Sequence, residues 1–180
     1  MKSKITLATL CTVFLSSDSL YGYNCPSIPK DWDGKTLEAS GPITWSVGKI
    51  TKDLNLAKVT WQAHQAWILT KNKKKHDKYG YFQCVYKAID NKTKKTVGKL
   101  TIASPKTPEL EKLAAGSEFK GEKIDAVGKG ADEKASIADN QYSNKDKTVE
   151  GSKCTPTKGS PESLNKFPAA CEIVERPKKE

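Results

Sequence analysis

Apolar and polar side chains alternate along residues 57 to 103, which is the pattern of half-buried β-strands. From Ala57 to Leu69, lysine, threonine, glutamine and histidine occupy one set of positions. The other set, interrupted only by Gln65, holds Ala57, Val59, Trp61, Ala63, Trp67 and Leu69. A helix stays an alternative here, because another set also fits helical spacing: Leu56, Val59, Ala63, Ala66 and Trp67. We favour the strand, with Trp61 and Trp67 on one buried face.

Three further segments read as strands. Tyr79–Ile89 alternates and is rich in aromatic residues, Thr96–Ala103 is rich in β-branched residues, and Pro42–Val47 begins at a proline. Because the connections are short and polar, neighbouring strands are expected to pair antiparallel. The sequence therefore predicts a mainly β fold, an antiparallel meander of about four strands that is sandwich- or barrel-like. Cys171–Val174 is expected to add an edge strand.

Residues 104–153 differ from the β-rich core of residues 23–103. They hold one Phe and one Tyr among many Lys, Glu, Asp, Gly and Ser residues. A short helix is predicted, capped by Thr107, with Pro108 in its first turn and Gly116 at its end. The remainder reads as a flexible polar insertion, followed by a C-terminal segment and tail at residues 154–180.

Residues 1–22 read as a cleavable signal peptide. Lys2 and Lys4 precede an apolar run from Ile5 to Leu15, and small residues follow. Cleavage is expected between Ser19 and Gly22. The apolar run is too short to cross a bilayer as a helix, so no transmembrane span is expected in the mature chain. An uncleaved N-terminal anchor is the alternative. The signal indicates export to a periplasmic or extracellular space.

Four cysteines follow the predicted cleavage sites: Cys25, Cys84, Cys154 and Cys171. An even number of cysteines in an exported chain indicates disulfides. Three pairings are possible, and we favour Cys25–Cys84 with Cys154–Cys171. The spacings that typify a zinc site do not occur, so neither a metal nor another cofactor is expected.

The chain has 180 residues and a net charge of +10, and its basic excess lies in residues 23–103, which hold 15 basic and 6 acidic side chains. Residues 71–78 concentrate five lysines: Lys71, Lys73, Lys74, Lys75 and Lys78. This loop is a candidate for binding anionic surfaces, with a solvated hairpin loop as the simpler interpretation. Only Arg176 among the 31 basic residues is an arginine, and nucleic-acid motifs do not occur, which argues against specific nucleic-acid binding.

Candidate chemistry is otherwise sparse. Trp32 lies in a turn-like Asp-Trp-Asp-Gly stretch and is expected to be the most exposed tryptophan, which makes it a candidate binding residue. His64 is expected on the polar face of its strand. The motifs of serine or cysteine nucleophiles do not occur, and surface carboxylate pairs such as Asp31 and Asp33 are common in loops. An enzyme is therefore not favoured, and no catalytic residue is assigned.

Two short motifs, Cys25-Pro26 and Gly80-Tyr-Phe-Gln-Cys84-Val-Tyr86, carry a resemblance over residues 25–87. The chain resembles a family of small exported proteins of unknown function from Legionella-like and related gammaproteobacteria. That family also often carries two cysteines near its C-terminus, which Cys154 and Cys171 would match. The resemblance implies export and no particular active site.

Together these features predict an exported, disulfide-bonded protein that acts by binding an anionic surface, a glycan or a protein. Two alternatives remain open. One is an exported hydrolase that uses surface carboxylates or His64, and the other is a structural component of the cell envelope.

Overall fold

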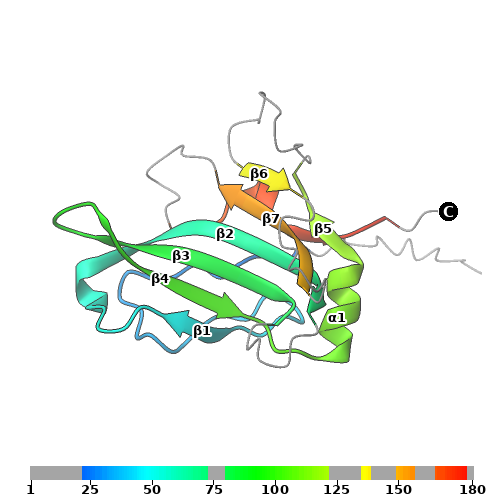
Figure 1. Ribbon diagram of the computed structural model, residues 1–180, viewed down its shortest axis with the longest axis horizontal. Coiled ribbons are helices and arrows are strands. Elements are labelled where there is room, and N and C mark those ends of the chain that lie inside the picture. The colour runs from blue at the N-terminus through cyan, green and yellow to red at the C-terminus, as the bar shows by residue number, and fades with distance from the viewer. Residues whose placement is uncertain (1–21, 73–79, 122–134, 139–148, 157–164, 178–180) are drawn as a thin grey trace, which may run out of the picture.

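The fold is known from a computed structural model that describes residues 22–72, 80–121, 135–138, 149–156 and 165–177. The predicted signal peptide up to residue 21 lies outside these residues. The described chain is mainly antiparallel β-structure, as predicted (Figure 1). A six-stranded sheet has the order β1-β4-β3-β2-β7-β6, and β5 and β8 form a two-stranded sheet. The strands are β1 (Ser46–Ile50), β2 (Val59–Asn72), β3 (Phe82–Asp90), β4 (Thr96–Ala103), β5 (Ser117–Phe119), β6 (Ala135–Ala138), β7 (Val149–Pro156) and β8 (Ile173–Glu175).

The large sheet is open, with β1 and β6 at its edges, so it does not close into a barrel. Strands β2, β3 and β4 form the predicted meander. The strand expected at Pro42–Val47 is β1, four residues later, and it pairs with β4 rather than with β2. The chain reaches β2 through a turn at Asp53, whose φ is 59°, and a short 3-10 helix, η1 (Leu56–Lys58).

The helix expected after β4 is α1 (Pro108–Ala115). The Thr107 hydroxyl accepts a hydrogen bond from the Leu110 amide at 3.3 Å, and Gly116 ends the helix. Both ends therefore follow the predicted capping residues. Leu110 and Ala114 are buried, and α1 packs against β2.

The expected flexibility of the rest of residues 104–153 stays a prediction, but the described parts of this segment form strands that its composition did not predict. Strands β5 and β6 and most of β7 lie in this segment, and β7 pairs with β2 inside the large sheet. At its inward positions β7 carries Ser152 and Cys154, opposite Ile68 and Ala66. Such small residues produce no hydrophobic periodicity, so composition concealed the strand.

The C-terminal segment also pairs differently from the prediction. A 3-10 helix, η3 (Ala169–Cys171), leads into β8, which pairs with β5 instead of extending the large sheet. Tyr23 forms a β-bridge with Ile173, which ties the N-terminal segment to β8.

The core lies between the inner face of the large sheet and the N-terminal segment of residues 22–45, which runs behind β2, β3 and β4 in Figure 1. Trp32 from this segment packs edge-on against Trp61 of β2, with ring centroids 5.8 Å apart. From the C-terminal segment, Phe167 packs edge-on against Tyr86 at 5.4 Å. Burying such aromatic side chains stabilises the fold by a few kcal/mol each, on the order of 2 to 3.

A β-bulge in the middle of β2 changes which side chains face the core. The register with β3 shifts between Ala63 and Gln65, so that His64 is the extra residue. Before the bulge Val59, Trp61 and Ala63 face inward, and after it Ala66 and Ile68 do. The prediction that Trp67 shares the buried face of Trp61 is therefore wrong. Trp67 is half-buried and points to the opposite, outer face of the sheet.

Candidate functional site

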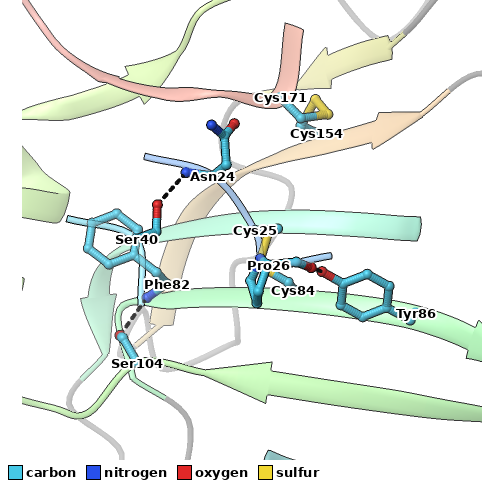
Figure 2. The surroundings of a disulfide bond; sticks show 10 residues. All are labelled: Asn24, Cys25, Pro26, Ser40, Phe82, Cys84, Tyr86, Ser104, Cys154 and Cys171. Atoms are coloured by element: carbon cyan, nitrogen blue, oxygen red, sulfur yellow. Dashed lines mark hydrogen bonds between the residues drawn. A yellow bond between two sulfur atoms is a disulfide. The ribbon is translucent and has the colours of Figure 1, made fainter. Parts of the chain in front are cut away.

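Two disulfides fasten the outlying segments to the large sheet (Figure 2). Cys25 bonds to Cys84 near the start of β3, with a Cα–Cα distance of 5.9 Å, and Cys154 of β7 bonds to Cys171 with a Cα–Cα distance of 5.6 Å. This is the pairing favoured from the sequence. Because all four cysteines are buried and bonded, none of them offers a thiolate for catalysis.

The two short motifs at Cys25-Pro26 and Gly80–Tyr86 contact each other. Beside the Cys25–Cys84 bond, the buried Tyr86 hydroxyl donates a hydrogen bond to the Pro26 carbonyl (Figure 2). Burial raises the pKa of the Tyr86 phenol far above its ordinary value. Gly80 lies against Ser104 so closely that a Cβ would overlap the Ser104 carbonyl. These motifs therefore hold the N-terminal segment on β3, which is a structural role.

The structure does not support the sequence-based interpretation of Trp32. Only 6% of this side chain is exposed, and its indole Nε1 donates to the Thr36 carbonyl at 2.6 Å. The loop is closed by Asp33, whose carboxylate accepts hydrogen bonds from the Thr36 and Lys35 amides. These hydrogen bonds lower the pKa of the Asp33 carboxyl. Trp32 is thus a core residue and offers no ring to a ligand.

The predicted basic loop lies largely outside the described residues. Lys73, Lys74, Lys75 and Lys78 fall there, so their role as candidate binding residues stays a prediction. Lys71 is described at the end of β2. Its Nζ lies 3.4 Å from a carboxylate oxygen of Glu150 on β7, and both side chains are partly exposed. The positive charge of Lys71 is therefore partly balanced by the Glu150 carboxylate.

The outer face of the large sheet carries a different set of basic side chains, which the sequence analysis did not group. We define the outer face by the residues that alternate with the buried ones on five adjacent strands. They are Lys49, Gln62, His64, Gln65, Trp67, Gln83, Val85, Lys87, Lys99, Thr101 and Lys153. All are half-buried or exposed. Only the register could reveal this grouping, because the residues come from separate parts of the chain.

Two lysines of the outer face are direct neighbours across the strands. Lys87 of β3 stands directly opposite Lys99 of β4, which brings their Cβ atoms to about 5 Å. Lys153 lies farther away, on β7, two strands from β3. It stands opposite Trp67 of β2, and its Nζ lies 5.6 Å from the centre of the indole ring. Among the described residues, no ion pair engages Lys87, Lys99 or Lys153. Like charges placed directly opposite one another are destabilising.

His64 lies among these lysines because the bulge turns it outward. Its pKa is lowered from the ordinary 6.5, first by partial burial and then by the positive charges of Lys87, Lys99 and Lys153. The imidazole is therefore neutral at neutral pH. A hydrolytic His is normally oriented by a carboxylate, whereas the charged groups that act on His64 from the described part of the chain are cationic.

Other chemical features are few in the part of the chain that the structure describes. There, no group of three or more His, Cys, Asp and Glu side chains is arranged to hold a metal ion. The helices of that part are all too short or too polar to cross a bilayer.

Comparison with protein-family models, curated proteins and solved structures finds no significant match for this chain. The resemblance carried by the Cys25-Pro26 and Gly80–Tyr86 motifs therefore stays a prediction. The arrangement of side chains on the outer face is the principal guide to function.

Proposed function

We propose that this protein is an exported, disulfide-bonded binding protein whose outer face binds an anionic partner. The observation that carries the proposal is the cross-strand pair of Lys87 and Lys99, with His64 near it and Lys153 farther along the same face. No carboxylate occupies an outward register position on the described parts of β1, β4, β3, β2 and β7. A fold that keeps unneutralised lysines together tolerates a repulsion, which an anionic ligand would relieve.

Export is supported by two features. The N-terminal residues have the composition of a signal peptide. The mature chain would then hold two buried disulfides, which form and persist in oxidising compartments. An oxidised, basic protein in such a compartment meets the anionic polymers of cell surfaces and of the extracellular space.

Elution from dextran sulfate beads with increasing NaCl tests the proposal. The triple variant Lys87→Gln/Lys99→Gln/Lys153→Gln is compared with Lys30→Gln/Lys35→Gln/Lys58→Gln, which has the same net charge but changes exposed lysines away from the outer face. We expect the outer-face variant to elute at a clearly lower salt concentration than the control. Equal elution of the two would show that total charge alone governs binding, and it would overturn the proposal.

The predicted loop at residues 71–78 is tested on the same beads. Lys73→Gln/Lys74→Gln/Lys75→Gln removes three positive charges from this loop. If this variant weakens retention as strongly as the outer-face triple, the loop is part of the binding surface. If it behaves as the control triple does, the loop is a solvated connection.

A further inference from the structure

We infer that the anionic partner of the outer face is a linear polysaccharide bearing carboxylate groups, with Trp67 as the residue on which a sugar ring stacks. The inference rests on the proposed function and deepens it by naming the ligand class. It depends on which side chains separate the lysines and on the place of Trp67 among them.

Uncharged side chains that can form hydrogen bonds lie next to the lysines of the outer face. Gln62 stands beside Lys87, and Thr101 stands beside Lys49. Gln83 lies opposite Trp67, and Gln65 lies opposite Val85. Amides and hydroxyls donate and accept hydrogen bonds at once, as do sugar hydroxyls. The face therefore offers partners both for the carboxylates and for the hydroxyls of an acidic sugar chain.

Trp67 lies on β2 directly opposite Lys153 of β7. It is half-buried, and Lys153 lies over its ring. A carboxylate bound by Lys153 would bring the rest of its sugar residue to the indole. Aromatic rings pack well against apolar C–H faces while their edges remain in water. The combination suits a ring that carries both an apolar face and a charge.

The spacing of the charges also favours an extended chain. Lys87 and Lys99 lie on β3 and β4, and Lys153 lies on β7, with β2 between β7 and β3. Adjacent strands are about 4.8 Å apart and residues rise about 3.3 Å along a strand. Lys153 and Lys99 are therefore three strand spacings, about 14 Å, apart across the sheet and four residues, about 13 Å, apart along it. A polymer with a charge on successive sugar units can contact both ends of the face, whereas a single small anion cannot.

Other polyanions fit these side chains less well. Lysine is depleted in the cores of protein–protein interfaces, where arginine and aromatic residues are enriched. Phosphate recognition in nucleic acids leans on the planar fork of arginine, and the outer face has no arginine among its residues. Binding to lipid headgroups needs charge alone, and it assigns no part to Trp67 or to the glutamines.

The test is isothermal titration with two carboxylate polysaccharides, polygalacturonate and hyaluronate, at low and moderate salt. The comparison ligands are neutral dextran, a single-stranded oligothymidylate and phosphatidylglycerol vesicles. The proteins are the wild type, Lys87→Gln/Lys99→Gln, Trp67→Ala and the control Lys30→Gln/Lys35→Gln. We expect at least one of the acidic polysaccharides to bind more tightly than every comparison ligand.

The variants separate the inference from the proposed function. We expect Lys87→Gln/Lys99→Gln and Trp67→Ala each to lose at least tenfold in affinity for the polysaccharide, and the control to lose less than twofold. Unchanged affinity in Trp67→Ala, or tighter binding of the oligonucleotide or the vesicles, would overturn the polysaccharide inference alone. If Lys87→Gln/Lys99→Gln binds with the same affinity as the wild type, or if no anionic ligand binds, the proposed function is overturned as well.

Discussion

Trp61 and Trp67 lie six residues apart on β2 and face opposite sides of the sheet. In an unbroken strand an even separation places two side chains on the same face. The extra residue at the bulge, His64, reverses the alternation between them. Trp61 consequently packs against Trp32 in the core, and Trp67 joins Lys153 on the outer face.

The two tryptophans should therefore respond differently to truncation. Trp61→Ala removes a fully buried ring and should lower the free energy of unfolding by about 3 to 5 kcal/mol. Trp67→Ala removes a ring that is only half-buried and should cost less, about 1 to 2 kcal/mol. Urea unfolding followed by circular dichroism measures both. If Trp61→Ala does not fold, Trp61→Phe provides a milder comparison. A larger loss in Trp67→Ala than at position 61 would contradict the assignment of faces.

The Tyr86 hydroxyl should contribute to stability in a pH-dependent way. Tyr86→Phe leaves the buried Pro26 carbonyl without its donor and should cost about 1 to 3 kcal/mol near neutral pH. Burial raises the pKa of Tyr86 in the folded state, so its contribution is complete below the ordinary tyrosine pKa, about 10, and is lost as the pH rises above it.

Unfolding of wild type and Tyr86→Phe between pH 8 and pH 11.5 measures this effect. We expect the wild type to lose stability more steeply above pH 10 than the variant. The raised pKa values of Tyr23 and Tyr81 act in both proteins and cancel in the comparison. Parallel curves would show that Tyr86 ionises as freely in the folded state as in the unfolded one.

Reversing one charge of the Lys87–Lys99 pair should stabilise the fold and weaken ligand binding. Lys99→Glu replaces a cross-strand repulsion with an attraction, a gain of about 0.2 to 1 kcal/mol that salt should reduce. Lys52→Glu, an exposed change in a turn, serves as the control. Thermal unfolding and elution from dextran sulfate beads measure the two effects. Destabilisation by Lys99→Glu would argue against an uncompensated pair.

Protonation of His64 should strengthen binding of a polyanion. A bound anion favours the charged imidazole, which partial burial and then the neighbouring lysines disfavour in the free protein. Affinity should therefore increase as the pH falls from 8 to 5. Dextran sulfate keeps its own charge over this range, so its elution salt reports on the protein. In His64→Gln the increase should be much smaller, and an identical pH profile would exclude His64 from the binding surface.

Removing the disulfide that closes the longer loop should destabilise the protein more, because the entropy of loop closure grows slowly with loop length. The Cys25–Cys84 bond spans 59 residues and the Cys154–Cys171 bond spans 17. The chain-entropy estimates are about 4 and about 3 kcal/mol respectively. Urea unfolding of Cys25→Ala/Cys84→Ala and Cys154→Ala/Cys171→Ala tests this order. A greater loss from the shorter loop would mean that local contacts around Cys171 outweigh the loop entropy.

The parts of the fold that depend on local chemistry were predictable from sequence. Thr107, Pro108 and Gly116 mark the ends of α1 in the sequence itself, and the alternation in β3 survives because that strand has buried residues on one face only. Strand β7 could not be predicted, since its inward positions are small and its neighbour β2 lies far away in the sequence.

The candidate site was less predictable than the fold. Clustered lysines in the sequence drew attention to residues 71–78, whereas Lys87, Lys99 and Lys153 are isolated in sequence and meet only through strand pairing. Trp32 and Trp67 exchanged their expected environments. A residue in a turn-like sequence can be buried in the core, as Trp32 is. One bulge residue can turn a ring that periodicity assigns to the interior toward the outer face, as happens to Trp67.

The order of the disulfides along the chain bears on how the protein matures. Of the four bonded cysteines, the first pairs with the second and the third with the fourth, so neither loop encloses a cysteine of the other pair. In a chain that emerges from its N-terminal end and is oxidised as it emerges, Cys25 meets Cys84 before Cys154 and Cys171 have appeared. Simple vectorial oxidation thus yields the native pairing, and assembly has no obligatory step of disulfide isomerisation.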